Sequence, residues 1–333
     1  MKLLVLDGNS IINRAFYGIK LLTTKDGRYT NAIYGFMNIF YKLCDELHPD
    51  SVAFAFDLKA PTFRHKMYDE YKAGRKPMPP ELAEQMPVLK DLLRALGYKI
   101  VTKEGYEADD ILGTLAFSCK DGDECYIATG DRDSLQLVGD NVKVLLASTK
   151  MGRPETNIYD VKRIKDDYGV TPHQLIDIKA LMGDSSDNIP GVSGVGQKTA
   201  QSLISELGSI QNIYDNIDTI DIRETLRNKL KNDKDSAFMS YKLGEICKSV
   251  PIETDYSFYV PDEGDKGEAL SILHSLEMYK LIDKIGLNTV TYDAKPENTT
   301  VKDYKRVNSL NDFLLKANKL YFVYSVKDGR FES

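Results

Sequence analysis

The sequence predicts an α/β fold: a parallel sheet covered by helices on both faces, followed by a separate helical domain. Within the first 150 residues, short apolar runs alternate with segments of helical periodicity, which is typical of parallel sheets. From about residue 160 onward, helical spacing dominates until the last thirty residues. At 333 residues the chain also exceeds one average domain, so at least two are expected.

The predicted strands are five apolar runs bounded by turn signals. They are KLLVLD (2–7), SVAFAFD (51–57), YKIVT (98–102), ECYIAT (124–129) and VKVLLA (142–147). Apolar residues three to four positions apart predict helices over 33–47 and 82–96, the second with a kink at Pro87. Because functional crevices lie at the carboxyl ends of parallel strands, the residues after these runs are candidates for a site.

The second half of the chain predicts helices with no comparable strand. Apolar spacing over 175–182 and 200–207 is helical, and a long polar helical stretch follows Ile222. The polar segment TYDAKPENTTVKDYKRVN reads as a linker, and LYFVYSV after it as a new strand. The expected domains are therefore 1–170, 171–290, a linker over 291–308, and the truncated start of a further domain over 309–333.

The composition describes an ordinary soluble globular protein, with 42% hydrophobic and 28% charged residues. No apolar run approaches the ~20 residues that span a bilayer, and MKLLVLDGNS is too short for a signal peptide. The four cysteines show no CxxC spacing. They favour a reducing cytoplasm over a disulfide framework or a zinc knuckle.

Acidic residues follow four strands in succession. Asp7 and Asp57 end the first two strands, GYEADD follows the third, and TGDRDS follows the fourth. A further acidic pair lies in MGDSSDN at the end of a helix. The candidate carboxylates are Asp7, Asp57, Glu107, Asp109, Asp110, Asp131, Asp133, Asp184 and Asp187.

Helical geometry orders the three acids of GYEADD. With about 100° per residue, the apolar stripe that begins at Ala108 faces the core. Glu107 and Asp109 flank this stripe, whereas Asp110 points away and is expected to support the site or face solvent. A simpler interpretation is that all three only complement the positive end of the helix dipole.

Carboxylates gathered on one rim repel each other unless they are protonated or bind cations. Oxygen-only ligands select hard ions such as Mg²⁺ or Mn²⁺. The four histidines lie outside the acidic motifs, so zinc is not expected. There are enough ligands for two ions, a known arrangement for displacement at phosphorus. An acidic rim without metal is the alternative. The net charge of −6 becomes mildly positive, +3, once the nine carboxylates are set aside.

Two further segments suit a polyanion. FRHKMYDEYKAGRKPMPP (63–80) interleaves basic residues with Tyr68 and Tyr71, which suits phosphates and unpaired bases, although a solvated loop is the simpler interpretation. GVSGVGQKTA (191–200) is a glycine-rich turn that enters a helix. Gln197 breaks the P-loop pattern, so a phosphate-backbone grip of the helix-hairpin-helix kind fits better than a nucleotide site, with a bare helix–helix turn as the alternative.

Taken together, these motifs resemble a known family. VLDGNS, FDLKAPTFRH, YKAGR, GYEADD, GDRDSLQL and GDSSDNIPGVSGVGQKTA occur in order, and the match covers roughly residues 1–290. The chain resembles the 5′ nuclease domain of bacterial DNA polymerase I, within the flap endonuclease superfamily. The resemblance implies a PIN-like parallel-sheet nuclease core, a helical arch over about 62–82, and a helix-three-turn-helix DNA-binding domain.

The resemblance also implies roles for the matching residues. Around a first metal ion would lie Asp7, Asp57, Glu107 and Asp109; around a second, Asp131, Asp133 and Asp187, with Asp110 and Asp184 in support. Residues of the arch and its base would steer the scissile phosphate and the 5′ strand: Arg64, Tyr71, Lys72 and Arg75. Arg14 would lie near the phosphate. The grip on duplex backbone would comprise Gly191, Gly194, Gly196, Lys198 and Thr199.

The expected protein is thus a monomeric, cytoplasmic, Mg²⁺- or Mn²⁺-dependent nuclease, the N-terminal part of a larger polymerase chain. It would cut DNA or RNA/DNA at 5′ ends, nicks and flaps during primer removal and repair. The alternatives are a HAD-type phosphatase, disfavoured by Asn9 where a second aspartate is needed, and a catalytically silent DNA-junction binding module. A PIN-type ribonuclease is the nearest enzymatic neighbour.

Overall fold

The computed structural model describes residues 1–150, 153–289, 325–327 and 330–332. The chain separates into two compact units, Met1–Tyr292 and Asp293–Ser333, which are described individually. Among the described residues no helix has both the length and the apolar character needed to cross a membrane.

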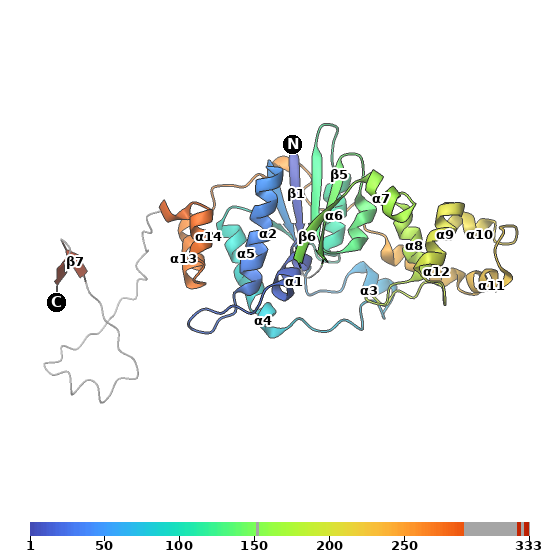
Figure 1. The fold of residues 1–333 in the computed structure, drawn as a ribbon, viewed down its shortest axis with the longest axis horizontal. Helices are drawn as coiled ribbons and strands as arrows, with labels where there is room; N and C mark the ends of the chain where they lie inside the picture. Colours follow the sequence, from blue (N-terminus) through green and yellow to red (C-terminus); the bar gives the residue numbers. More distant parts are fainter. Residues whose placement is uncertain (151–152, 290–324, 328–329, 333) are drawn as a thin grey trace, which may run out of the picture. The chain divides into compact units, whose positions relative to one another are not determined.

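The first unit is built on a six-stranded sheet with the order β3-β2-β1-β4-β5-β6 (Figure 1). Its strands are β1 (Lys2–Asp7), β2 (Ser51–Ala55), β3 (Lys99–Val101), β4 (Glu124–Thr129), β5 (Val142–Lys150) and β6 (Arg153–Tyr159). The five predicted strands pair in parallel, which confirms that part of the prediction. A sixth strand, β6, was not predicted and pairs antiparallel with β5 at one edge. Its sequence RPETNIY is polar and contains a proline, so it lacks an apolar strand signal.

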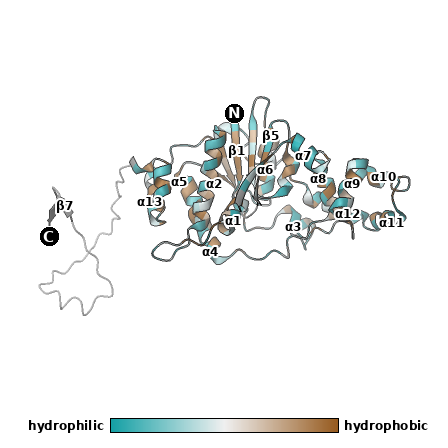
Figure 2. Ribbon diagram, viewed as in Figure 1, coloured by the Kyte–Doolittle hydropathy of each residue, from teal (hydrophilic) through white to brown (hydrophobic). Residues whose placement is uncertain are grey.

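Strand residues alternate between two cores, one on each face of the sheet. In β1, Leu4 and Leu6 enter one core, whereas Leu3 and Val5 enter the other. The first core is covered by α1 (Gly8–Gly18), α2 (Asn31–Leu47), α5 (Gln85–Ala95), α13 (Lys266–Ser275) and α14 (Tyr279–Lys284). The second is covered by α6 (Ala108–Phe117), η1 (Arg132–Leu137), α7 (Val161–Tyr168) and η2 (Tyr256–Tyr259). The central strands are accordingly hydrophobic along their length, whereas the helices combine apolar and polar faces (Figure 2).

A third core lies within the helical region that follows the sheet. It is formed mainly by α8 (Gln174–Met182), α9 (Gln197–Leu207), α10 (Ile210–Asp215), α11 (Glu224–Asn232) and α12 (Lys234–Gly244). The long helix expected after Ile222 is two helices that meet at Asp233. The chain then returns to the sheet, because α13 and α14 pack in its first core. The expected domain boundary between residues 170 and 171 therefore stays a prediction.

Prolines shape the segment over 62–82, which we call the arch segment. Only α3 (Phe63–Met67) and the start of α4 (Pro80–Ala83) are helical here, since Gly74, Pro77 and Pro79 disfavour a continuous helix. The helix predicted over 82–96 is interrupted between α4 and α5 at Glu84. This break lies three residues before Pro87, whose ring excludes a helical bond to the carbonyl of Ala83.

In the second unit, β7 (Ser325–Lys327) and β8 (Arg330–Glu332) form an antiparallel pair. The predicted linker over 291–308 and most of the segment over 309–333 lie outside the described residues. The last described element of the first unit is η3 (Leu287–Thr289).

The turn before α9 depends on a glycine. Gly191 has φ +64°, and a Cβ there would lie 2.3 Å from the backbone nitrogen of Gly183. Replacing Gly191 with alanine should lower the free energy of unfolding by more than ~1–2 kcal/mol, because strain and a backbone clash add. Urea unfolding would measure this loss. Gly74→Ala is the matched control, since its Cβ would meet nothing within 4 Å, and equal losses in the two variants would contradict the interpretation.

Candidate metal centre

Acidic side chains from four strand ends meet in one cavity of about 390 Å³ at the carboxyl rim of the sheet. Its acidic lining is Asp7, Asp57, Glu107, Asp109 and Asp131, and three basic residues of the arch segment, Lys72, Arg75 and Lys76, line it too. Each acid is placed by an element end. Asp7 caps α1 by accepting from the Ser10 N–H at 2.9 Å, Glu107 is the N-cap of α6, and Asp131 caps η1.

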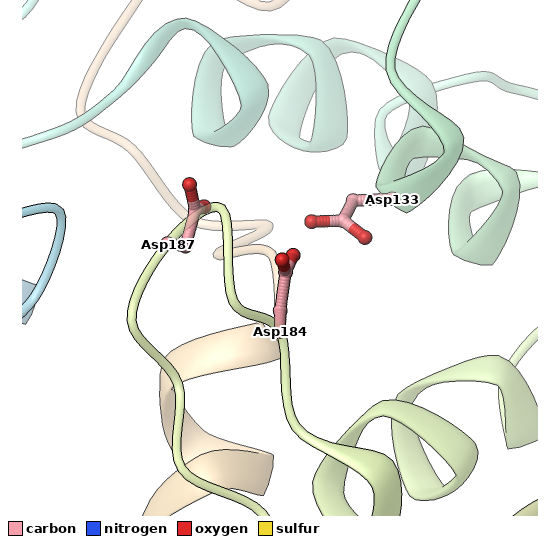
Figure 3. A group of neighbouring side chains, drawn as sticks. All are labelled: Asp133, Asp184 and Asp187. Atoms are coloured by element: carbon pink, nitrogen blue, oxygen red, sulfur yellow. The ribbon is translucent and has the colours of Figure 1, made fainter. Parts of the chain in front are cut away.

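A second acidic group adjoins this cavity. Asp133, Asp184 and Asp187 each offer a carboxylate oxygen, and these oxygens lie within 4.8 Å of one another (Figure 3). Asp133 is on η1, whereas the other two lie on the turn after α8. This turn is closed by two reciprocal backbone bonds of 2.8 Å between Asp184 and Ile189. Asp133 also raises the pKa of Asp109 in the first group. Because the two groups interact electrostatically, the structure brings together the predicted rim of carboxylates.

Burial and mutual repulsion raise the pKa values of several of these acids. Burial, followed by the charges of Asp57 and Asp131, raises the pKa of Asp7 to about 7 despite hydrogen bonds from Ser10 and Thr129. Burial also raises the pKa of Asp133 to about 6 and moves the pKa of Asp109 well above its usual range. One oxygen of Asp109, Oδ1, is buried and makes no hydrogen bond. An oxygen-only donor set with a buried carboxylate oxygen that makes no hydrogen bond fits hard divalent cations.

Sequence reasoning missed a lysine in the second acidic group. Lys179 of α8 is 6% exposed; its ammonium group contacts the carboxylate of Asp133 and lies 2.8 Å from that of Asp184. Burial alone would raise the pKa of Asp184, but the hydrogen bonds from Lys179 and Ser186 lower it to about 2. The available signal was a lysine within the apolar stripe of a predicted helix, five residues before an acidic motif.

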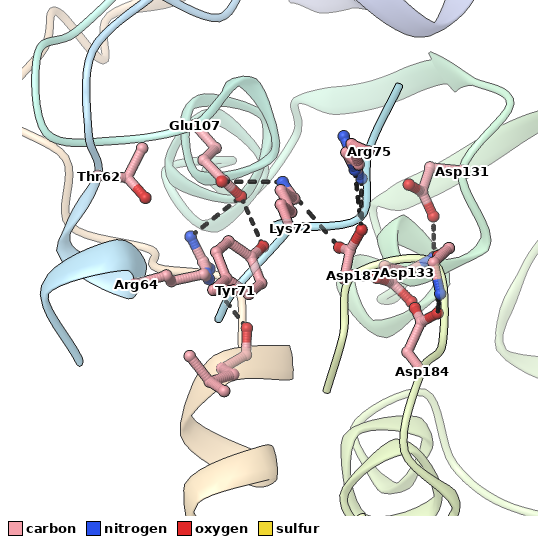
Figure 4. Close-up of polar contacts among 12 residues, drawn as sticks. Thr62, Arg64, Tyr71, Lys72, Arg75, Glu107, Asp131, Asp133, Asp184 and Asp187 are labelled. Carbon is pink, nitrogen blue, oxygen red and sulfur yellow. Dashed lines mark hydrogen bonds and ion pairs between the residues drawn. The ribbon is translucent and has the colours of Figure 1, made fainter. Parts of the chain in front are cut away.

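The arch segment contacts both acidic groups (Figure 4). The Lys72 ammonium lies 2.8 Å from one oxygen of Glu107, and the Tyr71 hydroxyl donates to the other at 3.1 Å. The Arg75 guanidinium lies 2.5 Å from the Asp187 carboxylate. Lys72 and Arg75 are therefore where the sequence predicted them, beside the acids and within the cavity.

The expectation that Arg64 steers the scissile phosphate is wrong, because its guanidinium is buried and fully engaged. Arg64 is 2% exposed and forms a bidentate pair with Asp110, with both distances 2.8 Å. It also donates to the carbonyls of Leu243 at 2.9 Å and Glu245 at 2.7 Å. Arg64 thus joins α3, α6 and the end of α12, and its Nη1 also lies 3.5 Å from a carboxylate oxygen of Glu107.

Of the two expectations for Asp110, exposure to solvent is wrong, because this residue is fully buried. Besides Arg64, it accepts from the backbone N–H groups of Glu107 at 3.0 Å and Cys247 at 2.9 Å. Asp110 is buried because the segment after α12 covers the side of α6 that an isolated helix would expose. With each oxygen accepting two bonds, Asp110 supports the site through Arg64 and Glu107.

Tyr71 also differs from the expectation that tyrosine faces stack on unpaired bases. Its ring is 4% exposed and packs with Ile189 and Leu243. Only its hydroxyl reaches the site, where it fixes Glu107.

The predicted DNA contacts lie on separate elements. Arg14 of α1 is partly buried and donates to the carbonyl of Ser148 on β5. Gly191 and Gly194 take positive φ values of 64° and 71°, and Gly196 is the N-cap of α9. Lys198 and Thr199, in the first turn of that helix, are exposed. The backbone N–H groups of this helix start are therefore available to an anion.

A parallel sheet with a carboxylate rim, a basic segment beside it and an adjoining helical region together define an acidic-site nuclease fold. Two sequence profiles match the chain: "5'-3' exonuclease, N-terminal resolvase-like domain" over residues 2–169 and "5'-3' exonuclease, C-terminal SAM fold" over residues 170–266. The chain belongs to the 5′-3′ exonuclease family.

Curated relatives include DNA polymerase I of Caldicellulosiruptor bescii, 41% identical over 98% of this chain, and that of Bacillus subtilis, 40% identical over 92%. The chain spans only 39% and 35% of their respective lengths. Among solved structures, T5 5'-exonuclease with bound zinc ions has a TM-score of 0.60 at 22% identity, covering 82% of this chain and 99% of that one. The catalytic core of Rad2 in complex with DNA has a TM-score of 0.55 at 19% identity, covering 86% and 92%. These two structures support the fold.

The raised pKa of Asp7 predicts a pH-dependent effect of Asp7→Asn in the metal-free protein. A carboxyl group whose folded pKa of about 7 exceeds its unfolded value of 3.8 stabilises the fold most below pH 3.8, and this contribution is lost as the pH rises through 7. The melting temperature of Asp7→Asn minus that of the wild type, measured in EDTA, should therefore increase between about pH 5 and about pH 8. A difference that stays constant or decreases would contradict the shift.

The buried Arg64–Asp110 pair predicts a large loss of stability in Arg64→Met. An unpaired buried carboxylate should lower the free energy of unfolding by ~3–5 kcal/mol in urea titrations. Arg75→Met is the control, because the Arg75 side chain is 50% exposed and its pair should contribute only ~0–1 kcal/mol. Similar losses in both variants would argue against a structural role for Arg64.

Proposed function

We propose that this chain is a structure-specific 5′ nuclease that hydrolyses phosphodiester bonds at the 5′ ends and flaps of DNA or RNA/DNA. The observation that carries the proposal is the convergence of eight carboxylates on one rim beside Lys72 and Arg75. Carboxylates gathered this densely, with burial raising the pKa values of Asp7, Asp109 and Asp133, suit divalent cations and the phosphate groups that such cations bind.

The residues fit two Mg²⁺ or Mn²⁺ ions. One would be held by Asp7, Asp57, Glu107 and Asp109, and the other by Asp131, Asp133 and Asp187 with Asp184. Such a pair supplies activation of water and stabilisation of charge on the attacking and leaving oxygens of a phosphodiester. The oxygen of Asp109 that makes no hydrogen bond supports the first set.

The basic residues of the arch segment serve the scissile phosphate. Lys72 and Arg75 line the cavity, and both are paired with carboxylates of the site. When a phosphate enters, each cation can exchange its carboxylate for a phosphate oxygen, which lowers the barrier by electrostatic stabilisation. The Tyr71 hydroxyl and the Arg64 guanidinium donate to the Glu107 carboxylate, and Asp110 accepts from the Glu107 N–H. These contacts hold Glu107 in place.

The turn before α9 supports binding of duplex backbone. Its N–H groups, with exposed Lys198 and Thr199, would contact phosphates and read no base. Specificity would then come from the shape of a duplex junction with a free 5′ strand, and affinity would fall steeply with salt. The solved relatives include a T5 flap endonuclease complex with DNA and metal ions and Rad2 with DNA substrate, which supports this class of partner.

The wider role follows from the curated relatives. Because the chain spans about two fifths of DNA polymerase I sequences, we infer that it acts as the nuclease part of a larger polymerase chain. Its work would be primer removal and repair in the cytoplasm, as a monomer. A HAD-type phosphatase is disfavoured, because Asn9 occupies the position of the second aspartate and its side-chain oxygen accepts the Asp57 N–H at 3.1 Å.

Asp131→Ala should abolish cleavage of a 5′-labelled flap while flap binding persists. Asp131 lines the cavity and caps η1, so its loss removes one ligand and leaves the duplex grip intact. The measurement is single-turnover cleavage with Mg²⁺, with Mn²⁺ and with EDTA, beside a binding titration. Unimpaired cleavage by the variant, or wild-type cleavage in EDTA, would refute the metal assignment. A panel of DNA and RNA flaps would separate this activity from that of a PIN-type ribonuclease.

Lys72→Ala should slow the single-turnover rate by about 10²–10³-fold, the size typical of one lost electrostatic contact to a transition state. Duplex affinity should change little, because Lys72 lies in the cavity and not on the turn before α9. A large loss of affinity with an unchanged rate would remove Lys72 from the chemistry.

A further inference from the structure

The turn that carries Asp184 and Asp187 is attached to the arch segment by a side chain without any assigned role. Asn188 takes a left-handed conformation with φ +57°, and its side-chain amide donates to the carbonyl of Glu70 at 2.9 Å. Asn188 is exposed, so burial does not fix it. Because the acceptor is a main-chain carbonyl, this hydrogen bond to the arch segment does not depend on the side chain at residue 70.

Two more contacts join the same two segments. The backbone N–H of Lys72 donates to the carbonyl of Asp187 at 2.9 Å, and Arg75 pairs with the Asp187 carboxylate. Tyr71 packs against Ile189 directly beneath them. The turn and the arch segment are thus joined by backbone, side-chain and apolar contacts that involve four residues of the arch segment, Glu70, Tyr71, Lys72 and Arg75.

Backbone strain is concentrated at this junction. Among the described residues, four that are not glycine have positive φ, and two of them, Lys72 at 59° and Asn188 at 57°, lie on the two sides of it. Such conformations persist only where surrounding contacts over-determine them. Asparagine tolerates the left-handed region better than most residues, whereas lysine does not. The conformation of Lys72 therefore depends on the contacts that the turn provides.

Lys72 connects the junction to the first acidic group as well, through its 2.8 Å pair with Glu107. A displacement of the arch segment would move Lys72 away from Glu107 and release Asp187 together. We propose that Asn188 is a positioning residue that fastens the Asp184–Ile189 turn to the arch segment, so that seating of the 5′ strand under the arch and placement of the second metal's carboxylates are one event. The expected effect on the 5′ strand and on the metal site rests on the proposed nuclease function, whereas the attachment of the turn to the arch segment does not.

The test compares Asn188→Asp and Asn188→Gly with the wild-type full chain. Aspartate keeps the size and the left-handed tolerance but replaces the amide donor with an acceptor, whereas glycine keeps the backbone conformation and removes the side chain. Ser185→Ala, at another exposed position of the same turn, is the matched control.

The first measurement is limited trypsin digestion of the metal-free protein without DNA, following cleavage after Lys72 and Arg75, since Pro77 blocks cleavage after Lys76. Both Asn188 variants should be cut about fivefold faster than the wild type, the effect of losing one hydrogen bond on a local opening equilibrium. Ser185→Ala should be cut at the wild-type rate. Equal protection in all four proteins, or faster cutting in Asn188→Gly alone, would overturn the proposal, because the amide would then hold nothing.

The second measurement is flap cleavage with and without excess Mn²⁺. Both Asn188 variants should lose about tenfold in kcat with little change in KM, and excess Mn²⁺ should restore part of the loss because it refills a weakened site. A merely structural defect would lower the melting temperature and would not respond to Mn²⁺, and that result would overturn the proposal. If protease protection changes as expected while the wild type cleaves no flap, the fastening stands and the nuclease function fails.

Discussion

Burial of carboxylates at one rim of the sheet, together with their mutual repulsion, is the constraint on which the rest of the structure depends. Asp7, Asp109 and Asp133 sit in surroundings that raise their pKa values, so the site is costly to form with all its acids charged. The chain meets this cost with basic side chains brought in from outside the sheet. Arg64 belongs to α3, Lys72 to the arch segment and Lys179 to α8.

These cations do different work because their burial differs. Arg64 is saturated by Asp110 and two carbonyls, so it stabilises α6 permanently and has no donor left for a ligand. Lys72 pairs with Glu107 and, at 4.0 Å, with Asp187, and Arg75 pairs with Asp187. Both cations line the cavity, where a phosphate could compete for them. Lys179 is also buried, and it contacts two acids of the second group, Asp133 and Asp184. The more buried cations thus support the structure, whereas the proposed contacts to substrate fall on the more exposed Lys72 and Arg75.

The same pairs also connect regions that are distant in the chain. Arg64 reaches the end of α12, whose Ser240 hydroxyl accepts the Gly191 N–H at 2.9 Å in the turn before α9. Asp187 reaches the arch segment from the turn after α8. The region that would grip a duplex, the segment that would receive a 5′ strand and the acidic rim therefore share hydrogen bonds.

The sequence by itself determined the sheet, the acidic rim and the basic segment beside it, because strand periodicity and the acids after each strand are local properties of the chain. It could not determine β6, a polar strand held by pairing with β5, nor the burial of Asp110, Arg64 and Tyr71. Their surroundings come from α12 and the segment after it, more than a hundred residues away in sequence. Lys179 was missed for the same reason, since the ion pairs of this lysine with Asp133 and Asp184 form only in the folded chain.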